Sequence, residues 1–125
     1  MVSPGYPKWV TIVDDEAVVR DALLDLLDSA GFPACAFACA EEFLASGRQY
    51  ECSCLITDIR MPGISGLDLQ SRLKAERLRI PIIFITAHGD ERMRMRALGA
   101  GAVEFLAKPL DDEVLLDAVR AALEW

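Results

Sequence analysis

Short apolar runs alternate along the chain with longer segments in which apolar residues recur at helical spacing. The apolar runs are bounded by turn residues and predict buried strands over 8–13, 32–38, 52–57, 80–86 and 102–107. The segments between them predict helices over 16–30, 40–46, 66–77, 90–98 and 111–123. Alternation of this kind is typical of an α/β fold in which helices cover both faces of a parallel sheet.

The expected sheet is doubly wound and five-stranded, in the flavodoxin-like strand order 2-1-3-4-5. Right-handed crossovers leave few alternatives, and in this order the first and third strands flank the crevice where ligands bind. Pro33 near the start of the second strand is typical of an edge position, and Glu104 within the fifth strand suits an edge or an interface. The 80–86 run is the most apolar, so we expect it to be central.

Acidic residues follow two of the predicted strands. Asp58 comes directly after the third strand, and a charge there is costly to bury unless it is paired or coordinated. Asp14, Asp15 and Glu16 follow the first strand, where acids could stabilise the start of the next helix or bind a cation. Helix stabilisation alone does not explain why two of these acids lie at the same sheet edge as Asp58.

Two further polar residues, Thr86 and Lys108, follow the fourth and fifth strands. Clustered carboxylates would repel one another, and Mg²⁺, which prefers oxygen ligands, would relieve that repulsion. With the metal present, Asp58 could attack a phosphoryl group as a nucleophile. Lys108 could neutralise a phosphoryl oxygen, and the Thr86 hydroxyl could bind another. Taken singly, however, Thr86 would be an ordinary strand-end threonine and Lys108 a solvated lysine.

Composition narrows the function classes. The 125 residues suit one domain with a short lead-in over 1–7, and the formal net charge of −7 argues against direct nucleic-acid binding by this chain. No apolar run approaches the roughly 18 residues that span a bilayer, and no signal-peptide pattern opens the chain, so we expect a cytoplasmic protein. The cysteines form no C-x-x-C pair, and we predict small buried hydrophobic residues rather than metal ligands at Cys35, Cys39, Cys52 and Cys54.

Four motifs in order resemble the receiver domain of two-component response regulators over essentially the whole chain. They are Val-Asp-Asp-Glu at 13–16, Asp-Ile-Arg-Met-Pro-Gly at 58–63, Ile-Thr-Ala at 85–87 and Lys-Pro at 108–109. Each motif is weak alone, but their order and spacing together are specific. Within that family, the segments 85–90 and 101–109 are most similar to the FixJ type.

The resemblance implies a Mg²⁺ site and a phosphorylation site. A histidine kinase would transfer a phosphoryl group to Asp58. Asp14, Asp15 and Asp58 would bind Mg²⁺ together with the backbone carbonyl of Arg60. Such a domain catalyses its own phosphorylation and dephosphorylation but is not a turnover enzyme.

The resemblance also implies a conformational switch. Thr86 would be the switch hydroxyl and Phe105 the aromatic switch. Lys108 would contact the phosphoryl group, and the peptide bond between Lys108 and Pro109 would be cis. The side chains of Arg60 and His88 could tune the phosphate lifetime, although His88 is first of all a loop residue facing solvent.

The output is expected to run through the face formed by the helix 90–98, the strand 102–107 and the helix 111–123. The family commonly forms phosphorylation-dependent homodimers through this face, and FixJ-type proteins usually continue into a DNA-binding effector domain. We expect a single receiver domain over 1–125 with no effector domain in this chain. A row of arginines on a helix usually faces solvent, and that is the default interpretation of the 90–98 helix. The alternative is an interface, for which the candidate residues are Arg92, Arg96, Glu104, Asp111 and Asp112.

Two other classes share parts of this pattern. A phosphatase of the haloacid-dehalogenase kind would need a second acid two residues after its strand-end aspartate, and Arg60 occupies that position. A flavodoxin-like cofactor binder would need a Ser-, Thr- or Gly-rich loop after the first strand, where this chain has three acids. Fold alone does not decide between such functions.

Overall fold

The computed structural model describes residues 8–124, which form one five-stranded parallel sheet with the order β2-β1-β3-β4-β5. This confirms the predicted fold class and strand order. The strands are β1 (Trp9–Val13), β2 (Ala34–Phe37), β3 (Cys52–Asp58), β4 (Ile82–Thr86) and β5 (Glu104–Ala107). The expected lead-in over 1–7 lies outside the described residues.

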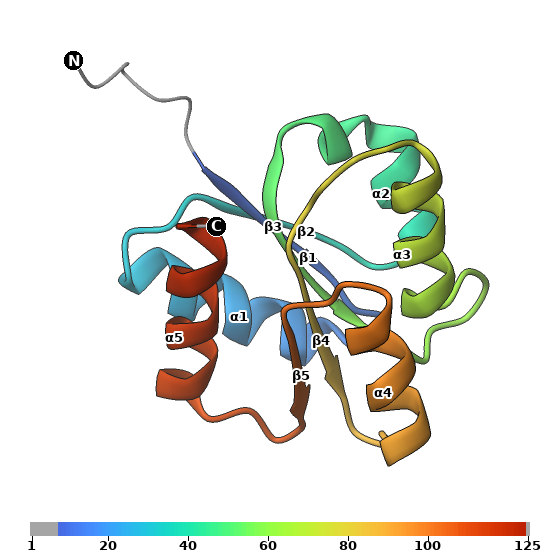
Figure 1. Cartoon of the computed structure of the whole chain (residues 1–125). Helices are drawn as coiled ribbons and strands as arrows, with labels where there is room; N and C mark the ends of the chain where they lie inside the picture. Colours follow the sequence, from blue (N-terminus) through green and yellow to red (C-terminus); the bar gives the residue numbers. More distant parts are fainter. Residues whose placement is uncertain (1–7, 125) are drawn as a thin grey trace.

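Helices cover both faces of the sheet, as Figure 1 shows. They are α1 (Ala17–Ser29), α2 (Ala40–Ser46), α3 (Gly66–Ala75), α4 (Glu91–Gly99) and α5 (Asp112–Leu123), with one short 3₁₀ turn, η1 (Arg48–Tyr50). One face packs on α1 and α5 through residues such as Leu27 and Leu115. The other face packs on α2, α3 and α4 through residues such as Phe43, Leu69 and Ala97.

The positions of the strands within the sheet agree with those predicted from the sequence. β2 and β5 are the edges, as Pro33 and Glu104 suggested. The most apolar run forms β4, which lies inside the sheet between β3 and β5, as expected for a central strand. Every residue of β4 is buried, since helices cover both faces of an interior strand.

Helix ends follow the local sequence closely. Ser65, Asp90 and Asp111 each accept a hydrogen bond from the backbone N–H three residues on, which fixes the starts of α3, α4 and α5. α3 ends two residues before the predicted end at Arg77, which adopts a left-handed conformation with φ of 62°. No helix within residues 8–124 is long and apolar enough to cross a membrane.

Candidate functional site

The carboxyl ends of four strands bring the predicted site residues to one edge of the sheet. Asp14 directly follows β1, and Asp58 is the last residue of β3, which pairs with β1. Thr86 ends β4, which pairs with β3, and Lys108 directly follows β5. Parallel pairing places all four strand ends at the same edge, so the side chains converge although they span 94 residues of sequence.

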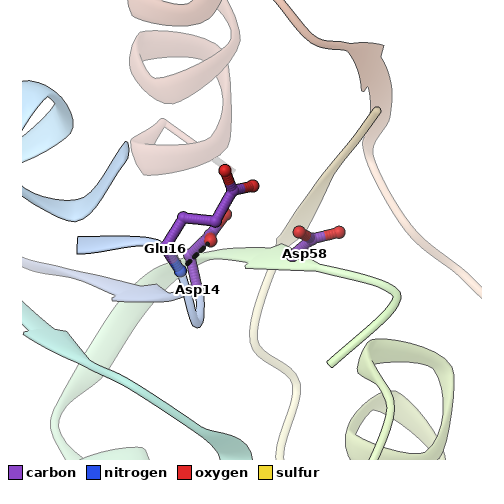
Figure 2. A group of neighbouring side chains, drawn as sticks. All are labelled: Asp14, Glu16 and Asp58. Carbon is purple, nitrogen blue, oxygen red and sulfur yellow. Dashed lines mark hydrogen bonds between the residues drawn. The ribbon is translucent and has the colours of Figure 1, made fainter. Parts of the chain in front are cut away.

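Three carboxylates gather at this edge. Asp14, Glu16 and Asp58 each offer an oxygen, and these oxygens all lie within 4.8 Å of one another. Figure 2 shows Asp58, on β3, beside Asp14 and Glu16, which follow β1. Asp14 is completely buried and Asp58 nearly so, whereas the Glu16 side chain is 57% exposed. Such a group of hard oxygen ligands fits Mg²⁺.

The Lys108 ammonium lies among these carboxylates. Its Nζ is 2.9 Å from Asp14 Oδ2, from Glu16 Oε1 and from Asp58 Oδ2. Burial alone would lower the pKa of Lys108, but the hydrogen bonds to Asp58, Asp14 and Glu16 outweigh it and raise this pKa above its ordinary value. Lys108 therefore carries a fixed positive charge that compensates the buried carboxylates.

Burial also governs Asp14. Removal from water raises the pKa of this carboxyl above its ordinary value, although hydrogen bonds from the Glu16 backbone and from Lys108 act in the opposite direction. The Glu16 N–H donates to Asp14 Oδ1 at 2.8 Å, and Arg20 Nη1 donates to the Asp14 carbonyl at 2.7 Å. These contacts fix the turn between β1 and α1 and hold the Asp14 side chain toward Asp58.

The carboxylate of Asp58 is held from both sides. Oδ1 accepts the backbone N–H of Ile59 at 2.6 Å and that of Arg60 at 3.3 Å. Oδ2 accepts from Lys108. One oxygen is thus anchored to the following loop while the other faces the Lys108 ammonium, an arrangement that orients the group within the cluster.

The set of acids differs from the predicted one at one position. Asp15 is exposed and does not belong to the group of close carboxylates, whereas Glu16 does. The cause is local: the turn closed by the Glu16 N–H on Asp14 brings Glu16 to the same side as Asp14. The run of three acids after β1 was the available signal for Glu16, but we assigned only its first two members. The metal-binding role of Asp15 stays a prediction.

Thr86 and Phe105 lie close to each other beside the cluster. Thr86 is 2% exposed, and its Oγ1 accepts the His88 N–H at 3.3 Å. A methyl group added at Gly89 would lie 2.7 Å from Thr86 Cγ2 and 2.8 Å from Phe105 Cε1. The loop after β4 therefore packs tightly on both expected switch residues, and sequence reasoning missed the contribution of Gly89.

The remaining expected residues lie at the surface or the rim. The Lys108–Pro109 bond is cis in the structure, and Arg60 and His88 are exposed. The candidate interface residues are all exposed: Arg92, Arg96, Glu104, Asp111 and Asp112. Asp111 is also the N-cap of α5. Two large apolar side chains are exposed on the same helices, Met95 on α4 and Val114 on α5.

The cysteines are free thiols, and within residues 8–124 none belongs to a group that could hold a metal. Burial raises the pKa of Cys54 to about 12 and that of Cys52 to about 11. We expect iodoacetamide at pH 8 to leave Cys54 unmodified in the native protein and to modify it in urea, as peptide mass mapping would show. Modification of native Cys54 at the rate of the unfolded chain would contradict this.

Comparison with known proteins identifies the family. A model of the response regulator receiver domain matches residues 10–120. Nodulation protein W of Bradyrhizobium diazoefficiens is 49% identical over 115 residues, which are 92% of this chain and 51% of that protein. The transcriptional regulatory protein FixJ of the same organism is 40% identical over 123 residues, 98% of this chain and 58% of that protein. The chain belongs to the response regulator receiver family.

Solved structures agree with this assignment. The structure titled FixJ-N is 40% identical, with a TM-score of 0.85 over 96% of both chains. Response regulator StyR is 49% identical, with a TM-score of 0.88 over 95% of this chain and 60% of that one. The domain thus belongs to two-component signalling. The chain spans about half the length of the curated relatives that it matches.

Proposed function

We propose that this domain is a phosphorylation-dependent switch in which Asp58 accepts a phosphoryl group from a histidine kinase. The observation that carries the proposal is that the Lys108 ammonium donates hydrogen bonds to both Asp58 and Asp14 at one sheet edge. A buried strand-end carboxylate held by an ammonium group, with oxygen ligands for a cation beside it, is suited to phosphoryl transfer.

The residues divide the chemistry among them. When bound by Asp14, Asp15 or Glu16 and Asp58, with the Arg60 carbonyl, Mg²⁺ would offset negative charge on the phosphoryl oxygens. An oxygen of Asp58 attacks phosphorus as the bond from phosphorus to the kinase histidine nitrogen breaks. The other ring nitrogen of that histidine carries a proton taken from solvent, so the histidine leaves as a neutral imidazole. The result is an acyl phosphate on Asp58.

The other polar groups at the edge stabilise that product. Lys108 exchanges a carboxylate partner for a phosphoryl oxygen and so keeps its charge compensated. The Thr86 hydroxyl donates to a second phosphoryl oxygen. The resulting movement of Thr86 favours a different position of the adjacent Phe105 ring, which carries the change to the face of α4, β5 and α5.

The test of this assignment is the site and chemistry of the modification. After incubation with acetyl phosphate and Mg²⁺, the label is expected on the peptide that contains Asp58. An acyl phosphate is cleaved by neutral hydroxylamine, whereas a phosphate ester on Ser or Thr survives. A hydroxylamine-stable label, or a label on another peptide, would contradict the proposal.

Arg60 and His88 are expected to tune the lifetime of the acyl phosphate. Both are exposed at the rim, one two residues after Asp58 and the other two residues after Thr86. Arg60→Ala and His88→Ala should each speed autodephosphorylation, because smaller side chains leave more room for the attacking water. Phosphate release after removal of the donor measures this rate. Unchanged rates in both variants would disprove the idea.

Phosphorylation is expected to promote homodimerisation through the face of α4, β5 and α5. Arg92 and Arg96 lie four residues apart on α4 and could meet Glu104, Asp111 or Asp112 of a second copy. Arg96→Glu should weaken the dimer by at least about tenfold through like-charge contact. Sedimentation velocity with and without a phosphoryl mimic measures the dimer.

The matched control for that experiment is Arg72→Glu, which makes the same charge change at an exposed position on α3. This variant should dimerise as the wild type does. Equal monomer content in the wild-type protein with and without the mimic would refute phosphorylation-dependent dimerisation.

The remaining expectations are proposals that rest on the family. We infer that the chain is one receiver domain, that it acts in the cytoplasm, and that it catalyses only reactions of its own aspartyl phosphate. FixJ is named as a transcriptional regulatory protein, and we propose that this domain likewise controls a transcriptional output through an effector rather than through nucleic-acid binding of its own.

A further inference from the structure

The loop that follows Asp58 leads from β3 to α3 and contains Arg60, whose carbonyl is a proposed metal ligand. The loop is fixed at its base, where the Gly66 N–H donates to the Ile59 carbonyl at 2.8 Å. Gly66 is buried, and its Cα lies so close to the Asp58 backbone that an added methyl group would overlap the Asp58 carbonyl oxygen. These contacts fix the two ends of the loop but do not reach its tip.

The tip is held from another helix. Oε2 of Glu41, in the first turn of α2, accepts the Ile64 N–H at 3.2 Å across 23 residues of sequence. Gly63, the preceding residue, adopts φ of 79°, and a methyl group added there would overlap the same carboxylate. Glu41 and the bare backbone of Gly63 therefore fit against each other, an approach that a larger residue would prevent.

An acid in the first turn of a helix has an ordinary explanation, because it stabilises the positive end of the helix dipole. Glu42, which lies in the same turn, has that use as well. Among residues 8–124, however, only Glu41 of this pair forms a hydrogen bond through its side chain. The contact with the loop is thus specific to Glu41 and is not required for starting α2.

We propose that Glu41 is a positioning residue that holds the loop after Asp58 in the conformation that presents the Arg60 carbonyl to the metal. This inference rests on the proposed function, because it takes that carbonyl as a ligand. Glu41 anchors the amide of Ile64, four residues beyond Arg60, and so limits how far the loop can move away from Asp58. The contact also couples α2 to the site, although no residue of α2 lies in the carboxylate cluster.

Metal affinity tests the inference with matched variants. Glu41→Ala should raise the Mg²⁺ dissociation constant by about tenfold, as loss of a supporting contact around a metal site commonly does. Glu41→Gln should bind nearly as the wild type does, since its amide oxygen can still accept the Ile64 N–H. Glu42→Ala, which removes the same charge from the same turn, should bind unchanged. Equal dissociation constants for Glu41→Ala and Glu42→Ala would overturn the proposal.

A second measurement works without metal and separates this inference from the proposed function. In the metal-free protein, the Ile64 amide should exchange its hydrogen about tenfold faster in Glu41→Ala than in wild type or Glu42→Ala, the effect of one lost hydrogen bond. An unchanged exchange rate would show that Glu41 does not hold the Ile64 amide, and it would overturn the inference. If exchange accelerates as expected but wild type binds no Mg²⁺, the proposed metal role of the site fails, and so does a positioning role toward that metal.

Discussion

Replacing Lys108 by methionine is expected to lower the free energy of unfolding of the metal-free protein by about 3 kcal/mol. The Lys108 side chain is 11% exposed, and its ammonium is the partner of the buried carboxylates of Asp14 and Asp58. Methionine retains most of the volume but leaves these two charges without compensation. Urea unfolding at neutral pH measures the loss, and Mg²⁺ should recover part of it by binding the carboxylates of the folded state.

Lys74→Met provides the control for that experiment. Lys74 is exposed on α3, and among residues 8–124 its side chain forms no ion pair. This variant should unfold within about 0.5 kcal/mol of the wild type, as surface substitutions usually do. Equal stability of Lys108→Met and Lys74→Met would show that the buried carboxylates do not depend on Lys108 for charge compensation.

Replacing Gly66 by alanine is expected to cost about 3 kcal/mol of stability, the upper part of the range for overpacking. The added methyl group would overlap the Asp58 carbonyl oxygen and lie 3.0 Å from the Asp58 carbonyl carbon and from Ile59 Cα. All three atoms belong to the backbone, so no side chain can rotate away. The strain falls on the junction that carries Asp58, and phosphorylation should slow together with the loss of stability.

Gly99→Ala makes the same chemical change at the end of α4, where an added methyl group would meet no atom within 4 Å. It should be neutral or stabilising by up to about 1 kcal/mol, because alanine favours the helix. Urea unfolding of both variants makes the comparison. A Gly66→Ala protein as stable as Gly99→Ala would show that the backbone at Asp58 can move freely.

The fold could be predicted from the sequence because its signals are local and periodic. The apolar runs gave every strand, and the cap residues Ser65, Asp90 and Asp111 mark the helix starts that the structure shows. The apolar 80–86 run also indicated an interior strand, and β4 is one, buried on both faces by helices. The left-handed residue Arg77, which ends α3 early, lies in a stretch with no glycine to signal it.

The site residues that lie at the carboxyl ends of strands could be predicted from the sequence. Asp14, Asp58, Thr86 and Lys108 converge because parallel strands end at one edge, and spacing along the chain was enough to find them. Contacts that depend on how a loop folds could not be found in this way. The place of Glu16 in the carboxylate cluster follows from the turn that its N–H closes on Asp14, which no sequence pattern marks.

The contact of Glu41 with the loop after Asp58 illustrates the same limit. Glu41 and Ile64 lie 23 residues apart, one in α2 and the other in the loop between β3 and α3. The sequence pattern of α2 marks Glu41 and Glu42 alike as acids at a helix start. Only the left-handed Gly63 and the direction of the Ile64 N–H distinguish between them.

The measurement that tests the central claim most directly is the intact mass of the protein after incubation with acetyl phosphate. Wild type and Asp58→Asn are compared, each with Mg²⁺ and with the metal removed by a chelator. We predict that one phosphoryl group is added only to the wild type and only with Mg²⁺. No gain in mass in the wild type, or an equal gain in Asp58→Asn, would contradict the assignment of Asp58 as the phosphoryl acceptor.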